Sequence, residues 1–206
     1  ITFIPGTFAI TAAPTTTVVT CTASVVYTGS PLEPCTYTVT GPNLNIGPLP
    51  VPSSNYTANL NVGTATASFT YSPTMNHQGS SDSENFSITP ANQTINFPNP
   101  GPHTYGDPDF TVSATATSML PVSFSSDSPS SCTVTGNLVH ILAADFCSIR
   151  ASQGGNSNYN PAPDTGQTIT INKANAIINV TPYNVAYDAM SHTATGTATG
   201  VEMPVG

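Results

Sequence analysis

Four cysteines are the residues of this chain whose type and spacing most clearly predict a chemistry. Cys35 follows Cys21 after a short interval, and Cys147 follows Cys132 after nearly the same interval. Each pair fits a disulfide within one domain, and closing a loop of about 15 residues stabilises a domain by roughly 3 kcal/mol. Because oxidised cysteines are typical of exported proteins, the four residues predict two disulfides and an extracellular or cell-surface location.

Metal binding and free buried thiols are the alternatives for these cysteines. Structural zinc sites use paired ligands such as Cys-x-x-Cys, usually four ligands together, and the sequence contains no such pairing. The four histidines are scattered along the chain, at His77, His103, His140 and His192. We therefore expect no metal ligand and no cofactor, and free thiols remain the main alternative to disulfides.

Calcium is a further candidate ligand, because it binds oxygen atoms in loops between tandem domains. The acidic residues near the expected domain ends are Asp107, Asp109, Asp164 and Asp188. No EF-hand or Asp-rich nonapeptide pattern accompanies them. Asp107 and Asp109 flank Pro108, and an aspartate in such a turn usually bonds its own backbone. We expect solvated turns at these positions.

Catalysis would need a nucleophile beside a base that a third group orients. Ser191 with His192 and His140 with Asp145 are the neighbouring combinations, and in a serine-rich chain such neighbours arise by chance. No serine-elbow motif or histidine–carboxylate signature accompanies them. We expect no catalytic residue and no enzyme activity. Lys173 could form an isopeptide bond to an asparagine, but without an evident acidic helper a plain surface lysine is expected.

The composition restricts the partners of the chain. Only 6% of the 206 residues are charged and the net charge is −8, whereas roughly a quarter of residues are charged in typical domains. Lys173 and Arg150 are the only basic residues, too few to bind nucleic-acid phosphates or anionic lipid. No apolar run approaches the roughly 20 residues that cross a bilayer. We expect neither a nucleic-acid partner nor membrane insertion.

Two sequence markers recur in step and predict a repeat of about 80 residues. The first marker is a tyrosine in a turn segment, found at Tyr27, Tyr105 and Tyr187. The second is a strand that ends in isoleucine, found at Ile10, Ile88 and Ile171. Successive tyrosines are separated by nearly the same interval as successive isoleucines, and each isoleucine precedes the next tyrosine by an almost constant distance along the chain. Two independent markers thus support the same repeat.

Alternation of apolar and polar residues predicts strands with one face in a core. The clearest alternation covers residues 64–71 and 147–152, and further strands are expected at 111–116, 122–124 and 138–142. Turn-forming clusters rich in glycine, proline and asparagine separate these stretches. Several short strands in each repeat, without a convincing helix, predict a β-sandwich of immunoglobulin type.

The markers also set the expected domain boundaries. Residues 1–10 are predicted to be the last strand of a preceding repeat, and residues 11–89 and 90–172 to be two complete repeats. Residues 173–206 are predicted to open a further, incomplete repeat, because so short a segment cannot bury enough surface to fold as a lone sandwich. The expected fold class is all-β: tandem immunoglobulin-like β-sandwich domains in a beads-on-a-string array.

The second repeat carries a specific set of segments: Gln93 to Phe97, Thr104 to Asp107, Leu120 to Ser125, Cys132 to Gly136, Ile149 to Gln153 and Gln167 to Ile171. With these, residues 92–171 resemble a bacterial immunoglobulin-like module of the MBG family, in its Tyr-Gly-x subtype. Residues 173–197 resemble the Tyr-Asp-Gly subtype, with Ala189 in place of the usual glycine. Residues 11–89 and the leading Pro5 to Ile10 resemble related surface-protein modules more loosely.

The resemblance implies the function of such modules, which occur as spacers and adhesin stalks in long secreted or surface-attached bacterial proteins. Our first expectation is therefore a non-enzymatic stalk or spacer whose partners are neighbouring repeats. The second is a subunit of an extracellular filament, assembled head to tail by strand donation between chains. The third is a glycan- or protein-binding adhesin domain, in which exposed Tyr56, Tyr71 and Tyr159 could contact sugars. The sequence does not indicate the surface ligand.

Overall fold

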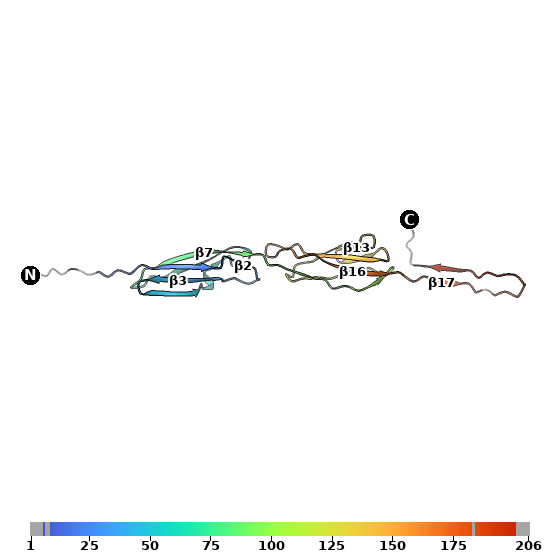
Figure 1. The fold of residues 1–206 in the computed structure, drawn as a ribbon, viewed down its shortest axis with the longest axis horizontal. Helices are drawn as coiled ribbons and strands as arrows, with labels where there is room; N and C mark the ends of the chain where they lie inside the picture. The colour runs from blue at the N-terminus through green and yellow to red at the C-terminus, as the bar shows by residue number, and fades with distance from the viewer. Residues whose placement is uncertain (1–5, 7–8, 183, 201–206) are drawn as a thin grey trace, which may run out of the picture. The chain divides into compact units, whose positions relative to one another are not determined.

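The computed structural model describes residue 6, residues 9–182 and residues 184–200. These residues form β-strands and one short 3₁₀ turn at Ser53–Asn55, without an α-helix among them, so the prediction of an all-β chain is confirmed. The chain divides into two compact units (Figure 1). Unit 1 comprises Ile1–Asn92 with Gly155–Asn160, and unit 2 comprises Gln93–Gly154 with Pro161–Gly206.

Unit 1 contains a three-stranded and a four-stranded sheet. The three-stranded sheet is antiparallel, in the order β1 (Thr16–Cys21), β3 (Cys35–Gly41), β4 (Leu44–Pro50). The four-stranded sheet has the order β2 (Ser24–Val26), β7 (Ser80–Thr89), β6 (Gly63–Tyr71), β5 (Tyr56–Thr57). In this sheet β2 runs parallel to β7, and the other neighbours are antiparallel.

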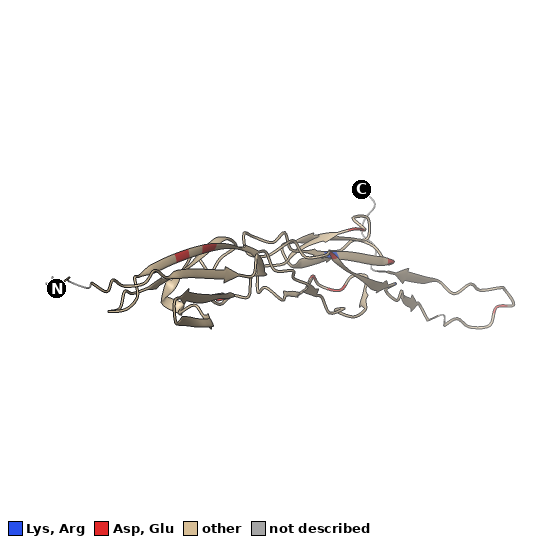
Figure 2. Cartoon of the chain, turned by 60° about the vertical axis from the view of Figure 1, so that its left-hand side comes forward, with Lys and Arg blue, Asp and Glu red and all other residues tan. Residues whose placement is uncertain are grey.

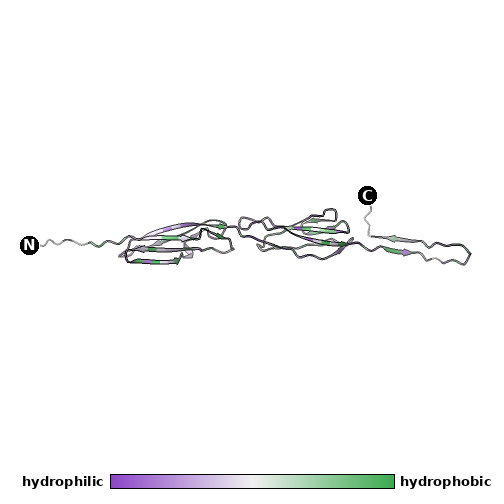
Figure 3. Ribbon diagram, viewed as in Figure 1, coloured by the Kyte–Doolittle hydropathy of each residue, from purple (hydrophilic) through white to green (hydrophobic). Residues whose placement is uncertain are grey.

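The core of unit 1 is built from alternate residues of both sheets. Its buried members are Val19, Cys35, Val51, Tyr56, Ala65, Ala67, Phe86 and Ile88. In β6, Ala65 and Ala67 are buried, and in β7 Phe86 and Ile88 are buried, while the residues between them face outward. Figure 3 shows the resulting alternation of hydrophobic and hydrophilic positions along the strands. This arrangement is consistent with a β-sandwich.

Unit 2 contains a four-stranded sheet in the order β12 (Ser123–Ser126), β15 (Phe146–Ser152), β16 (Thr165–Asn172), β9 (His103–Thr104). A three-stranded sheet has the order β10 (Phe110–Thr111), β14 (Leu138–Ile141), β13 (Cys132–Thr135), and β8 (Ile95–Asn96) pairs with β11 (Thr115–Ala116). The buried core consists of Phe97, Val112, Cys132, Val139, Ile141, Cys147, Ile149, Ala151, Ile169 and Ile171. β17 (Ile177–Val180) and β18 (Gly196–Thr199) form a separate antiparallel pair.

The four-stranded sheets of the two units share one arrangement at the marker tyrosine. In each, a short strand before the marker tyrosine runs parallel to the last strand, β2 with β7 and β9 with β16. The Tyr27 N–H donates to the Thr89 carbonyl at 2.9 Å, and the Tyr105 N–H donates to the Asn172 carbonyl at 2.8 Å. Within each unit, the marker tyrosine therefore hydrogen-bonds to the residue just after the isoleucine of the last strand.

Two strand predictions need comment. The strand predicted at residues 111–116 is wrong as a single element: Thr111 ends β10, which pairs with β14, whereas Thr115 begins β11, which pairs with β8. The chain changes partner between them, and Val112 and Ala116 are both buried. Most of the strand predicted at residues 1–10 lies outside the described residues, and Ala9 and Ile10 belong to no strand.

Side chains of β7 hold the outer edge of β1. The Val19 N–H donates to Asp82 Oδ2 at 2.8 Å, and the Cys21 N–H donates to Glu84 Oε2 at 3.1 Å. Asp82 and Glu84 occupy the same face of β7 as the buried Phe86, because side chains two apart in a strand share a face. Inward-pointing charged residues are a usual protection of an edge strand. Here they also supply charge-assisted acceptors for its amides.

Asp82→Ala is expected to lower the free energy of unfolding of unit 1 by about 1–3 kcal/mol, the cost of leaving a buried donor without its acceptor. The donor is the N–H of Val19, a residue that is 3% exposed. Asp82→Asn retains a side-chain oxygen as acceptor, so the free energy of unfolding is expected to fall by less. Urea unfolding followed by the NMR signals of unit 1 measures both, and equal losses would contradict the role of the acceptor.

Candidate functional site: the two disulfides

Each cysteine of the chain is part of a disulfide. Cys21 bonds to Cys35, with Cα atoms 4.1 Å apart, and Cys132 bonds to Cys147, with Cα atoms 5.6 Å apart. Unit 1 therefore holds one bridge and unit 2 holds the other. The two bridges occupy different places in their units, although they close loops of nearly equal length.

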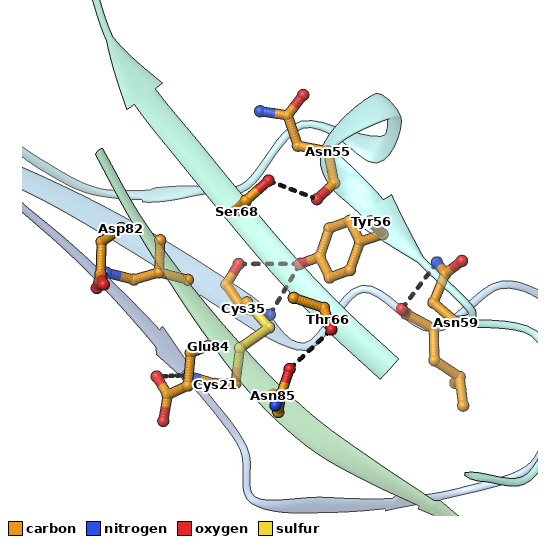
Figure 4. Close-up of a disulfide and its surroundings, with 12 residues drawn as sticks. Cys21, Cys35, Asn55, Tyr56, Asn59, Thr66, Ser68, Asp82, Glu84 and Asn85 are labelled. Atoms are coloured by element: carbon orange, nitrogen blue, oxygen red, sulfur yellow. Dashed lines mark hydrogen bonds between the residues drawn. A yellow bond between two sulfur atoms is a disulfide. The ribbon is translucent and has the colours of Figure 1, made fainter. Parts of the chain in front are cut away.

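The first disulfide connects neighbouring strands of one sheet. Cys21 ends β1 and Cys35 begins β3, and the two residues lie directly opposite each other. Their N–H groups point away from the ladder: the Cys35 N–H donates to Tyr56 Oη at 3.0 Å, and the Cys21 N–H donates to Glu84 (Figure 4). They thus form a pair without mutual hydrogen bonds, the type in which Cα atoms approach most closely. The bridge closes the segment that contains β2.

Tyr56 links this disulfide to the opposite sheet. It comes from β5, its ring packs edge-on against Phe86 at 6.1 Å, and its hydroxyl both accepts the Cys35 N–H and donates to the Cys35 carbonyl at 3.3 Å. Burial raises the pKa of Tyr56 above 10.0; the hydrogen bond to the Cys35 backbone opposes this rise, and the Glu33 carboxylate adds to it. The hydroxyl therefore stays neutral and keeps both bonds at neutral pH.

Tyr56→Phe is expected to lower the free energy of unfolding of unit 1 by about 1–3 kcal/mol, because the buried Cys35 N–H loses its acceptor. The raised pKa adds a pH dependence. As pH rises, the unfolded chain loses the Tyr56 proton before the folded chain does. The neutral Tyr56 hydroxyl therefore contributes its full stabilisation below pH 10.0, and unit 1 loses this stabilisation as pH rises above that value.

The measurement is the urea midpoint of unit 1 at neutral pH and at increasing alkaline pH, for the parent and for Tyr56→Phe. The variant is expected to show a smaller alkaline loss than the parent. If both lose the same stability between neutral and alkaline pH, Tyr56 is not the group responsible.

The second disulfide crosses the core of unit 2. Cys132 lies in β13 of the three-stranded sheet and Cys147 in β15 of the four-stranded sheet, and both are fully buried. The hydroxyl oxygens of Ser126 and Ser128 lie 3.6 and 3.8 Å from Cys132 Sγ. Unit 2 therefore joins its sheets covalently. In unit 1 the disulfide lies within one sheet, and hydrogen bonds of Tyr56, of the β7 carboxylates and of Ser80 connect the two sheets.

The aspartates considered for calcium lie against protein groups. Asp107 Oδ2 accepts the Thr104 N–H at 2.7 Å, as expected for an aspartate in a turn. Asp109 Oδ1 lies 2.6 Å from His140 Nδ1, so His140 meets Asp109 and not the neighbour Asp145 considered from the sequence. Both side chains of this contact are exposed.

Asp164 and Asp188 also have protein partners. Asp164 lies 3.8 Å from Arg150, which binds Asp127 more closely, at 2.6 Å. Asp188 Oδ1 accepts the Met190 N–H at 2.9 Å and lies 2.7 Å from His192, and these two bonds, the first more strongly, hold the pKa of Asp188 below 3.8. Within the described residues, no three His, Cys, Asp or Glu side chains are grouped so as to hold a metal ion.

The tyrosines proposed as sugar contacts are not freely exposed. Tyr56 is 8% exposed, so its prediction as a surface residue is wrong; its ring is needed in the core beside Phe86. Tyr71 and Tyr159 are half-buried. Lys173 is exposed between β16 and β17. Figure 2 shows how sparse the charged residues are along the chain.

No protein family model, curated protein or solved structure matches this chain. The fold and the bridges define an all-β protein with a disulfide in each of two compact units, and the MBG resemblance stays a prediction. Along the described residues, no helix is long and apolar enough to cross a membrane.

Proposed function

We propose that this chain is a non-enzymatic structural repeat region, a stalk or spacer of a large secreted or cell-surface bacterial protein. Its repeats would be immunoglobulin-like β-sandwiches at residues 11–89 and 90–172. The observation that carries the proposal is the repeated build of the two units: a four-stranded sheet with the same parallel pairing at the marker tyrosine, a separate core and one disulfide in each. A spacer needs such units because each can bear load without its neighbour.

The strand directions suit a load on the two ends of each unit. In unit 2, β9 near the start of the unit runs parallel to the last sheet strand, β16. When the ends of two parallel paired strands are pulled apart, the strands must slide past each other, and their hydrogen bonds break together. A pair that is unzipped from one end loses its bonds one at a time and resists less.

Unit 1 is expected to resist such a load through the hydrogen bonds between β1 and β7. The Cys21–Cys35 bridge takes the β2 segment out of the covalent path between the two ends. β1 stays in that path, and its bonds advance in parallel along β7, from Val19 with Asp82 to Cys21 with Glu84. These side-chain bonds are loaded side by side.

The adhesin and filament alternatives stay predictions. Two surface pockets are open and are each lined by a single stretch of chain, one by residues 58–64 and the other within residues 184–192. A small-molecule site usually combines polar groups that converge from several elements. Neither pocket favours a ligand-binding function over the structural one.

Single-molecule force–extension of the chain, held by its two ends, tests the proposal. Two unfolding events are expected, and a reductant is expected to lengthen each by about 5 nm, because it frees 14 or 15 residues of roughly 3.5 Å each. Cys21→Ala with Cys35→Ala should lengthen one event without reductant. Extension without force peaks, or a single event for the whole chain, would contradict a load-bearing repeat region.

A further inference from the structure

In three places a strand that lies earlier in the chain than a marker tyrosine pairs antiparallel with a strand that lies later: β1 with β3, β8 with β11, and β17 with β18. The last two share residue types and register. In unit 2 the opposed pairs are Ile95 with Ala116 and Asn96 with Thr115. In β17–β18 the opposed pairs are Ile178 with Ala198 and Asn179 with Thr197. The β17–β18 pair is thus built as the equivalent of β8–β11.

The equivalent side chains differ sharply in burial. Phe97, which follows β8, is 4% exposed, whereas Val180 at the matching position of β17 is 59% exposed. Ile178 is 72% exposed. Tyr105 packs against the core of unit 2, whereas Tyr187 is 95% exposed. Apolar residues whose equivalents are buried in unit 2 are therefore exposed to solvent in and near β17–β18.

Unit 2 itself shows what covers such a face. Phe97 shares its core with Ile149 of β15 and Ile169 of β16. Gln167 of β16 donates to the Phe97 carbonyl at 2.7 Å. The end of β16 also accepts the N–H of the marker tyrosine, Tyr105. The apolar face of a β8–β11 pair is therefore covered by an antiparallel strand pair that carries inward-facing isoleucines at alternate positions.

We propose that the face formed by Ile178, Val180 and Ala198 is one half of a third core, which the loop residue Tyr187 completes. In this proposal the face is covered by a strand pair of the β15–β16 type from the same polypeptide. In both units the covering strands come after the hairpin in chain order, β6 and β7 after β3 and β15 and β16 after β11. The same order assigns the covering pair to the same chain. This inference rests on the tandem-repeat part of the proposed function.

The test extends the full chain. A copy of residues 118–172 is placed directly after Thr199, because Thr199 of β18 matches Thr117, which follows β11. The chain has no tryptophan, so Tyr187→Trp in both the extended and the original chain gives a single fluorescent reporter. In the extended chain, the emission of this tryptophan is expected to shift to the blue. Amide exchange at Asn179 and Thr181, which lie in hydrogen-bonded positions of the β17–β18 pair, is expected to slow by at least about a hundredfold, as in a folded unit.

The matched control carries Ile149→Asp and Ile169→Asp in the appended copy alone, and it should leave the reporter in water and the amides fast. Three results would overturn the inference. The first is slow exchange at Asn179 and Thr181 in the original monomeric chain, and the second is an extended chain without protection. The third is protection in the original chain that rises with its concentration, which would make a second copy the occupant. The unfolding events of units 1 and 2 in the force–extension experiment do not depend on this fluorescence or amide exchange. Failure of this inference and failure of the proposed function can therefore be told apart.

Discussion

Replacing Cys132 and Cys147 together by alanine is expected to lower the free energy of unfolding of unit 2 by about 3 kcal/mol, the value for a loop of about 15 residues. The bridge joins the two sheets through the core. Both cysteines are 0% exposed, so alanine also leaves a small unfilled space. Urea unfolding followed by NMR signals assigned to each unit measures the loss, and unit 1 is expected to unfold as before.

The matched control is Cys21→Ala with Cys35→Ala, which should destabilise unit 1 by a similar amount because its loop has nearly the same length. Unit 2 should then keep its midpoint. Reductant added to the parent should lower both midpoints. An unchanged midpoint for unit 2 in the Cys132 and Cys147 variant would contradict the stabilising role of the bridge.

Phe86→Ala is expected to lower the free energy of unfolding of unit 1 by about 3–5 kcal/mol, the usual cost of removing a buried phenylalanine ring. Phe86 is 2% exposed and packs against the ring of Tyr56. Ser87→Ala is the control, because Ser87 faces outward on the same strand and an exposed substitution changes stability by less than about 0.5 kcal/mol. Midpoints of both units falling together in Phe86→Ala would contradict separate cores.

The strands at residues 64–71 and 147–152 could be predicted because period-two burial is a local pattern. Ala65 and Ala67 are buried in β6, and Ile149 and Ala151 are buried in β15, as the alternation requires. The cysteine pairing was likewise evident from spacing, since both bridges join cysteines that are close in the sequence. These features depend on neighbouring residues in the sequence.

Features that depend on distant pairing could not be predicted in the same way. Tyr56 reads as a surface tyrosine beside Asn55, and only the approach of Cys35 and Phe86 makes it a core residue. The acceptor role of Asp82 is equally hidden, because its donor, Val19, lies far earlier in the chain. The sequence contains the groups but not the sheet order that brings them together.

Digestion at glutamate, without reductant and in urea, tests most directly whether each repeat is closed by its own disulfide. Glu84 lies between the two cysteine pairs, after Cys35 and before Cys132. Two separate fragments, one ending at Glu84 and one beginning at Asn85, are expected by mass spectrometry before any reduction. A fragment ending at Glu84 that stays joined to the fragment beginning at Asn85 until a reductant is added would show a bridge between the repeats and contradict two separately closed units.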